Sequence, residues 1–379
     1  MTTSPRPGEL VVTVSGRTLG SMPMLVRTLG QVKVATARAN HDAGALDAET
    51  VQAIEIAAGP LIDGTFDPAE FPGDLLAGGG SIVVHRNINE VLARAAGVEP
   101  ADLAVSQSTA DVCHTAHRLA VLDGAGGLIE AAKLTIVEVR TVANRFEAIP
   151  TLARTCLRDA MATPLSTVFA GAAHALERRR AALVATMEPL HEVVLGSTVI
   201  GRGDGAPASY RAVVVGHLAD VTGLALVAHP SPASALQHGD DVAAVSSAVV
   251  QLSRPLLKLA SDLRLLGSGP RGGFGEVVLP HVMDGSSFFA DKSNPVIPET
   301  VVQACLQIRG LDHTVQLATD RAELYLHVFD GLAAVNVIDE MALLTRSFEL
   351  LSTAVLAELA ADEGRCHELA AFAAPTKQP

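Results

Sequence analysis

Long stretches with a helical pattern of apolar residues, separated by short polar segments, most constrain how this chain can fold. After Ser106–Asp111, about 35 residues keep a mostly helical pattern. Further helical patterns run over residues 165–195, 231–266, 295–321 and 326–359. Five long helices with short interruptions predict an all-α fold organised around a long central helical bundle.

The composition favours the same architecture. The 379 residues are 49% hydrophobic but only 3% aromatic, and there is no Trp. A core made of Ala, Leu and Val suits helices packed closely side by side better than a β-sandwich. The Ala-rich, weakly charged helix faces look too extensive for one chain to cover, which favours a homo-oligomer.

The predicted bundle is flanked by smaller parts. We expect a mainly helical N-terminal domain over residues 1–100, the bundle over 101–359 and a short C-terminal segment over 360–379. The first part would contain these elements: a β-like run over Glu9–Val14, an amphipathic helix from Met24, a helix capped by Asp47 that ends near Gly59–Pro60, and a helix over Asn87–Ala96 closed by Gly97. Residues 196–230, which include a Gly-rich run and the apolar Val213–Val215, are expected to break the helical pattern.

Charge and cysteine usage exclude several classes of function. A net charge of −13 argues against a nucleic-acid partner. No apolar run is long enough to span a bilayer, and no signal-peptide core is visible. The four scattered cysteines contain no CxxC pair, so neither a disulfide framework nor a zinc site is indicated. We expect a cytoplasmic protein without a metal, a cofactor or a membrane partner.

One polar stretch, residues 285–295, carries the side chains best suited to chemistry. It contains two serines, Ser286 and Ser287, followed by Lys292 and Asn294. Gly and Ser disfavour a helix here, and Asn-Pro then restarts the helical pattern. An ordinary turn with a helix cap would explain the composition alone.

The same stretch resembles the signature loop of the fumarase/aspartase superfamily of lyases, in its two serines, its Lys, its Asn-Pro and the Glu299 beyond. Four further segments resemble motifs of that superfamily in the same order: Asn87–Val91, Ser106–Asp111, Arg154–Asp159 and Gly267–Glu276. The resemblance extends over residues 24–366.

This resemblance implies a homotetramer with each active site built from three subunits. It also implies anti β-elimination next to a carboxylate, with Ser286 as the general base. Lys292 and Asn294 match the groups that neutralise the dianion formed. Residues matching substrate-binding positions are Ser108, Thr109, Thr155 and Ser287.

The chain departs from the superfamily pattern at several of these positions. Cys156 replaces the His that Glu299 would partner, so the imidazole that assists proton transfer is absent. Ala110 replaces an Asn and Ile82 a carboxylate-binding Thr. Other positions gain polar side chains: His85, Arg86, His114 and Arg158.

Each replacement has a functional and a plain interpretation. Cys156 would be a catalytic thiol or a tolerated cysteine, and His114 a substitute acid or an ordinary histidine. Arg86 and Arg158 would compensate as carboxylate clamps, or Arg86 would be a solvated residue at a helix start. The retained base and neutralising groups indicate altered specificity rather than loss of activity.

We therefore expect a lyase, specifically a carbon–nitrogen lyase, acting on an aspartate-like or N-substituted amino-dicarboxylate. The product would be fumarate or a related unsaturated acid. A C–O lyase or cycloisomerase of the same superfamily is the second interpretation, and a catalytically inactive scaffold is the third.

Overall fold

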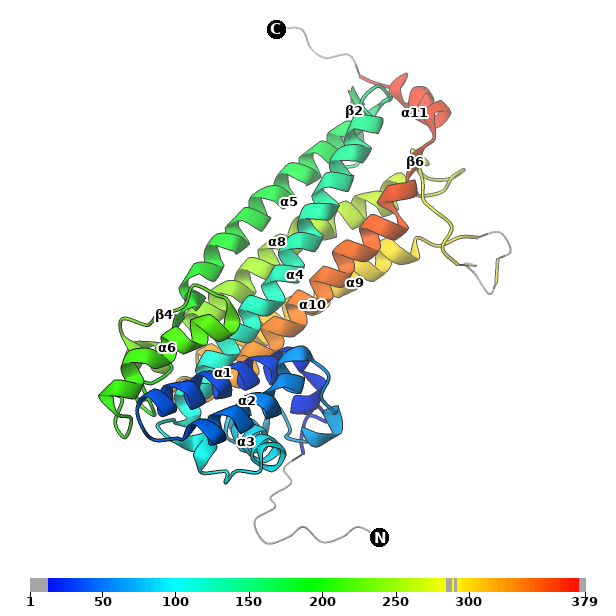
Figure 1. The fold of residues 1–379 in the computed structure, drawn as a ribbon. Coiled ribbons are helices and arrows are strands. Elements are labelled where there is room, and N and C mark those ends of the chain that lie inside the picture. Colours follow the sequence, from blue (N-terminus) through cyan, green and yellow to red (C-terminus); the bar gives the residue numbers. More distant parts are fainter. Residues whose placement is uncertain (1–12, 284–287, 290–291, 375–379) are drawn as a thin grey trace. The chain divides into compact units, whose positions relative to one another are not determined.

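The computed structural model describes residues 13–283, 288–289 and 292–374. These residues contain eleven α-helices and six short strands (Figure 1). The described residues divide into two compact units, the first lying within residues 1–124, 186–246 and 312–338. The second lies within the remaining stretches, 125–185, 247–311 and 339–379. Five long helices have residues in both units: α4 (Thr109–Arg145), α5 (Ser166–Met187), α8 (Asp240–Leu266), α9 (Val296–Thr319) and α10 (Asp330–Ala354).

The first unit also holds the shorter helices. These are α1 (Pro23–Asp42), α2 (Ala48–Asp63), α3 (Ile82–Ala96), α6 (Ala208–Thr222) and α7 (Pro232–Gln237). Helix α1 packs against both α2 and α6. Its buried Leu25, Leu29 and Val32 recur at helical spacing, and α6 contributes Val214 and Leu218 to the core. Burial of these apolar stripes accounts for the packing of the three helices.

Local sequence determines where several of these helices start and end. Asp47 caps α2, because its side chain accepts a hydrogen bond from the Thr50 amide at 2.8 Å. Gly97 ends α3 in the left-handed conformation, with φ of 70°. Both caps confirm the sequence predictions.

Two sequence predictions about this unit are wrong. Helix α2 does not end near Pro60 but continues to Asp63, and Gly64, with φ of 75°, ends it. Residues 196–230 are not free of helix, since they contain α6. A two-stranded parallel pairing of β3 (Glu192–Val193) with β4 (Val227–Ala228) frames this stretch. The predicted β-like run over Glu9–Val14 lies mostly outside the described residues.

The second unit contains the larger part of each of the five long helices. Its core consists of apolar side chains repeated every three or four residues, for example Leu252, Leu256, Leu259 and Leu263 of α8. Helices α4 and α10 meet where the Thr135 hydroxyl donates to the Phe348 carbonyl at 3.2 Å. This α-helical architecture confirms the predicted fold class.

A β-hairpin and a short C-terminal helix complete this unit (Figure 1). Strands β1 (Pro150–Thr155) and β2 (Arg158–Pro164) pair antiparallel, and α11 (Glu363–Ala370) packs on β1. Strand β5 (Val277–Val278) pairs with β6 (Ala360–Ala361), which joins the segment after α8 to the chain before α11.

Among the described residues, no helix is long and apolar enough to cross a membrane. The predicted boundaries at residues 100 and 359 stay a prediction.

Candidate functional site

A pocket of about 370 Å³ lies in the first unit, at the amino end of α4. It is lined by Ser108, Thr109, Ala110 and His114 from that helix and its preceding turn, and by Ile82 from α3. We call it the α4 pocket. The first backbone N–H groups of a helix have no partner within the helix and, with the helix dipole, favour an anion. The pocket therefore combines hydroxyl groups with a helix terminus suited to a carboxylate.

Asp111 holds the amino end of α4 in place. Its carboxylate accepts hydrogen bonds from the backbone amides of Ser108 at 2.9 Å, Gly196 at 3.0 Å and Thr198 at 3.1 Å. Burial raises the pKa of Asp111 to about 6, although these amides and the Lys33 charge oppose the rise. The carboxylate thereby ties the loop at 196–198 to the helix that carries the pocket hydroxyls.

A chain of hydrogen bonds reaches the pocket from the protein interior. His85 Nδ1 lies 2.8 Å from the Thr109 hydroxyl, and His85 Nε2 lies 2.8 Å from the Nζ of Lys33. His85 is 7% exposed and Lys33 is fully buried. Burial, followed by the Lys33 charge, lowers the pKa of His85 to about 3, so its ring is neutral near pH 7.

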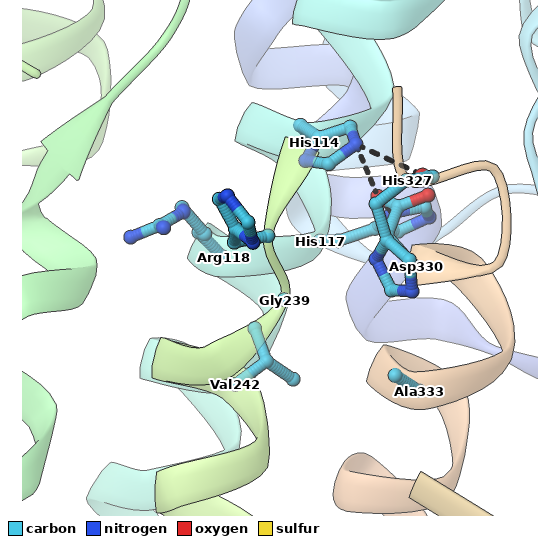
Figure 2. A pocket seen from close by; sticks show the side chains of 9 residues that line it. His114, His117, Arg118, Gly239, Val242, His327, Asp330 and Ala333 are labelled. Atoms are coloured by element: carbon cyan, nitrogen blue, oxygen red, sulfur yellow. Dashed lines mark hydrogen bonds and ion pairs between the residues drawn. The ribbon is translucent and has the colours of Figure 1, made fainter. Parts of the chain in front are cut away.

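A second buried cluster borders the same pocket (Figure 2). Asp330, at the start of α10, accepts a hydrogen bond from His117 Nδ1 at 2.6 Å and lies 3.5 Å from His114 Nε2. Burial alone would raise the pKa of Asp330, but the facing His114 and His117 hold it well below its usual range. Burial lowers the pKa of His114. This cluster pairs a buried carboxylate with two imidazole rings.

A small cavity of about 20 Å³ lies beside this cluster, lined by His117, His327 and Asp330. His327 Nε2 donates to the Ala318 carbonyl at 2.9 Å. Within the described structure, His117 Nε2 and His327 Nδ1 have no hydrogen-bond partner. The cavity is large enough for one water molecule within hydrogen-bonding reach of both nitrogens.

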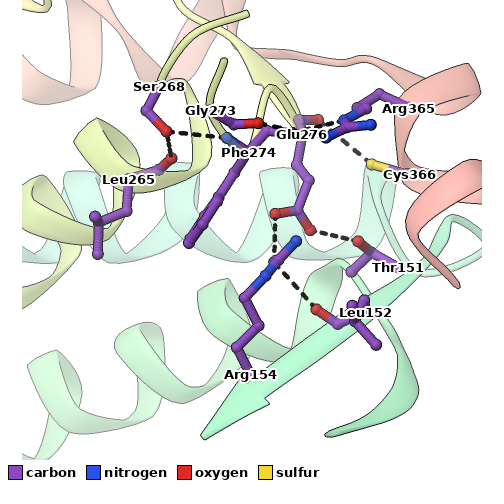
Figure 3. A network of polar contacts seen from close by, with 10 residues as sticks. All are labelled: Thr151, Leu152, Arg154, Leu265, Ser268, Gly273, Phe274, Glu276, Arg365 and Cys366. Carbon is purple, nitrogen blue, oxygen red and sulfur yellow. Dashed lines mark hydrogen bonds and ion pairs between the residues drawn. The ribbon is translucent and has the colours of Figure 1, made fainter. Parts of the chain in front are cut away.

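The second unit carries another polar network beneath the hairpin (Figure 3). The buried Glu276 accepts hydrogen bonds from Arg154, at 2.8 Å, and from the Thr151 hydroxyl. The Arg154 guanidinium also lies 4.1 Å from the centre of the Phe274 ring. These contacts hold the segment before the predicted catalytic loop against strand β1, next to a pocket of about 300 Å³.

Thr155 and Arg158 face each other at the exposed tip of the hairpin. The two residues between them, Cys156 and Leu157, have φ of 52° and 58°. Both angles lie in the left-handed region, which is unusual for residues with a Cβ and marks a tight two-residue turn. Cys156 is exposed and forms no disulfide.

The other predicted site residues are distributed as follows. Arg86 lies on the exposed face of α3, where its Nε contacts Glu90 at 2.6 Å. Lys292 is exposed with its Nζ 5.9 Å from the centre of the Phe289 ring, Asn294 is half-buried, and Glu299 lies 3.5 Å from Arg264. Ser286 and Ser287 lie outside the described residues.

The α4 pocket therefore brings together Ser108, Thr109 and His114, with His85 behind them. Sequence reasoning did not find Lys33, His327 or Asp330. The spacing of His114 and His117 on one helical face was the available signal for the buried cluster. No group of metal-ligating side chains suited to an ion occurs in the described part of the chain.

Comparison with known proteins gives one consistent result. A family described as lyase matches residues 14–310. An aspartate ammonia-lyase of a Bacillus species is 33% identical over 91% of this chain and 76% of its own length. A class II fumarate hydratase of Corynebacterium efficiens is 33% identical over 94% of this chain and 76% of its own length.

Solved structures agree. A fumarate lyase:delta crystallin from Brucella melitensis, in a crystal structure bound to cobalt, has a TM-score of 0.90 and is 33% identical. The match covers 94% of this chain and 80% of that chain. The family match covers most of the chain, and the sequence relatives exceed 30% identity over most of their length. The chain belongs to the fumarase/aspartase superfamily of lyases.

Proposed function

We propose that this protein is a carbon–nitrogen lyase that eliminates an amine from an aspartate-like or N-substituted amino-dicarboxylate, or catalyses the reverse addition. The observation that carries the proposal is the α4 pocket, in which Ser108 and Thr109 lie at the amino end of a long helix. Hydroxyl donors and a helix terminus together suit a substrate carboxylate. Relatives named aspartate ammonia-lyase, at 31–34% identity over more than 90% of the chain, support an amine leaving group.

In the proposed reaction, Ser286 removes a proton from the carbon next to a carboxylate. The electron pair passes into that carboxylate and forms a dianion, which Lys292 and Asn294 neutralise. The pair then returns to form the carbon–carbon double bond as the amine leaves from the neighbouring carbon. The product is fumarate or a related unsaturated acid.

The absent imidazole at Cys156 fits an amine better than a hydroxyl as leaving group. An ammonium leaving group already carries the proton it needs, so a dedicated acid at this position is less important. Glu299, which would partner that imidazole, contacts Arg264. We keep His114, paired with Asp330 beside the α4 pocket, as the proposed acid for leaving groups that need a proton.

The α4 pocket has lost two hydrogen-bonding side chains, at Ile82 and Ala110, relative to the superfamily pattern. A buried carboxylate group without a partner costs about 2 kcal/mol or more. Unmodified aspartate or fumarate is therefore expected to bind weakly unless Arg86 or Arg158 compensates. The apolar Ile82 would suit a substituent on the nitrogen.

We further propose a homotetramer whose active sites are shared between subunits. Long helices leave large apolar side chains exposed in the described chain, for example Leu134 and Val137 of α4 and Leu306 of α9, each more than half exposed. Burial of such side chains favours association. All four cysteines are free, which agrees with a reducing compartment, and we propose the cytoplasm.

An ultraviolet scan for a conjugated enoate tests the proposed reaction. The protein is mixed with aspartate, N-substituted aspartates and malate, and separately with fumarate plus amines. We expect signal with at least one nitrogen-bearing substrate. Ser286→Ala should abolish this signal, whereas the matched control Ser293→Ala, in the same segment, should retain it.

Three results would contradict the proposal. Signal with malate alone would favour the C–O lyase interpretation, which the fumarate hydratase relatives make a specific alternative. No signal with any nitrogen-bearing substrate, or full activity in Ser286→Ala, would refute the proposed reaction and leave a cycloisomerase or an inactive scaffold.

A further inference from the structure

Lys33 is a lysine enclosed in the first unit without any exposed surface. Lysine is almost never fully buried unless its charge is compensated. Three groups surround its Nζ: His85 Nε2 at 2.8 Å, the Leu103 carbonyl at 2.9 Å and Gln107 Oε1 at 2.8 Å. Three neighbours match the three hydrogens of an ammonium group.

Two of these neighbours accept hydrogen bonds whatever the charge of Lys33. The Leu103 carbonyl is an acceptor only. Gln107 is oriented by its amide nitrogen, which donates to the Val105 carbonyl at 3.1 Å, so its oxygen faces Lys33. The contact with His85 is therefore the one whose direction depends on the protonation of Lys33.

When Lys33 is charged, its third N–H must donate to His85 Nε2. The single proton of the neutral imidazole then lies on Nδ1 and is donated to the Thr109 oxygen, 2.8 Å away. The hydroxyl hydrogen of Thr109 remains available for the α4 pocket, which Thr109 lines. In this state Thr109 is a donor toward a ligand.

When Lys33 is neutral, the whole chain reverses. The lone pair of the amine accepts a hydrogen bond from His85 Nε2–H, and Nδ1 becomes an acceptor. Thr109 then donates its hydrogen to His85 and presents only lone pairs to the pocket. A carboxylate, which is acceptor-only, would be repelled by those lone pairs.

We propose that Lys33, His85 and Thr109 form a polarity relay, in which the protonation of the buried lysine determines whether Thr109 can donate a hydrogen bond to a carboxylate in the α4 pocket. The proposal rests on the proposed function and adds two positioning residues and a ligand requirement to it. Lys33 and His85 act through Thr109 and do not contact the ligand themselves.

The electrostatic surroundings support a change of state near neutral pH. Burial lowers the pKa of Lys33 to about 7, although Cys113 and Asp111 oppose the shift. The groups facing Lys33 are His85 from α3, and Cys113 and Asp111 from α4. Burial raises the pKa of Cys113, so its thiol stays protonated, and Asp111 with a pKa of about 6 is ionised above neutral pH. Lys33 is the member of this group that titrates near pH 7.

The relay also provides a balanced route for the proton. As Lys33 loses its charge, one Nζ–H passes to His85 Nε2, and the Nδ1–H passes to the Thr109 oxygen. The original Thr109 hydroxyl hydrogen leaves into the pocket, to water or to a base there. One proton leaves the protein, and each heavy atom keeps its normal valence.

Neutron diffraction on deuterium-exchanged crystals of the full chain tests the relay directly. At about pD 6, we expect three deuterons on Lys33 Nζ and one on His85 Nδ1. At about pD 9, we expect two deuterons on Nζ and the imidazole deuteron on Nε2. A deuteron on Nε2 at the lower pD, or the same tautomer at both, would overturn the proposal. This measurement requires no turnover, so its failure is distinguishable from failure of the proposed reaction.

Succinate binding, measured by calorimetry between about pH 7 and pH 9, gives an independent test. Succinate keeps both carboxylates ionised over this range. Wild-type affinity should fall about tenfold as pH rises, the size of one lost hydrogen bond to a charged group. Lys33→Met should bind weakly at both pH values, and Lys133→Met, which alters an exposed lysine, should behave as wild type.

His85→Asn is the conservative variant that separates polarity from packing. Its amide oxygen can accept from Lys33 while its NH₂ donates to Thr109, so affinity near pH 7 should be retained. His85→Leu, of similar volume, should lose it. A wild type that binds succinate equally at both pH values, or not at all, would overturn the proposal, as would equal affinities for the Asn and Leu variants.

Discussion

Replacing Lys33 by Met should make the stability of the protein respond differently to pH. The pKa of Lys33 falls from 10.5 in the unfolded chain to about 7 in the folded protein. The unfolded state therefore binds more protons between these values, so the folded state gains stability from Lys33 as pH rises through this window. Below about pH 7 both states are protonated, and the full cost of burying the charge is present.

The magnitude follows from the two pKa values. Each pH unit within the window is worth about 1.4 kcal/mol, and Lys33 is half protonated at the lower edge, so the gain from pH 7 to pH 9 is about 2 kcal/mol. Met cannot titrate. The free energy of unfolding of wild type minus that of Lys33→Met should therefore rise by about 2 kcal/mol over this range. Removing the Lys33 charge would also raise the pKa of Asp111 further. This makes the stability of Lys33→Met fall as pH rises, so it increases the wild-type-minus-variant difference as well.

Denaturant unfolding at about pH 7 and pH 9 measures this difference. Equal protein concentrations are required, because the unfolding of an oligomer depends on concentration. The matched control is Lys133→Met, since this exposed lysine pairs with Glu130 on the surface and should show a difference near zero. A wild-type-minus-Lys33→Met difference that stays constant or falls with rising pH would refute the reasoning.

Three further substitutions probe the remaining network and surface contacts. Arg154→Met should lower the free energy of unfolding by about 3 kcal/mol, because it leaves the buried Glu276 carboxylate without its cation. In a double-mutant cycle, adding Glu276→Gln should recover part of this loss. Leu157→Asn should raise that free energy by about 0.5–1 kcal/mol, since Asn tolerates a positive φ better than Leu and the Leu side chain is 70% exposed. A decrease in thermal unfolding temperature would contradict this. Arg86→Ala should change the free energy of unfolding by less than about 0.5 kcal/mol, because the contact of Arg86 with Glu90 is an exposed ion pair. If Arg86 binds a substrate carboxylate, the same substitution should raise KM about tenfold with the identified substrate. An unchanged KM would show that Arg86 is not part of the site.

The helices that the sequence predicted well are those with a strong local signal. Asp47 and Gly97 mark helix ends through side-chain and backbone chemistry that acts within a few residues. The amino end of α4 was predicted from the polar turn Ser106–Asp111 for the same reason. Such signals do not depend on the rest of the fold.

Helix α6 was missed because its local signals contradict its structure. The β-branched run Val213–Val215 and the preceding Gly-rich stretch favour other conformations. Only Tyr210, Val214 and Leu218 form its buried stripe, which packs in a unit where α6 contacts α1. Tertiary packing therefore overrides the local preference. The end of α2 was predicted too early for a similar reason. Pro60 disfavours a helix locally, but α2 accommodates it in its last turn.

The residues of the candidate site also differ in whether a local sequence signal marks them or only tertiary packing brings them together. Ser108 and Thr109 were predicted because they are adjacent in a recognisable motif. The relay was not, since Lys33 and His85 are separated by 52 residues and meet only after α1 and α3 have packed. His117 and Asp330 are 213 residues apart and escaped prediction for the same reason.

The three amide contacts of Asp111 have a kinetic consequence. These hydrogen bonds connect the pocket wall near Val199 to the amino end of α4. Widening the α4 pocket would therefore require several charge-assisted hydrogen bonds to break at once. The wall is thus already in place before a ligand arrives. We expect the association rate of a small dicarboxylate with this pocket to follow diffusion and local charge, without a slow opening step.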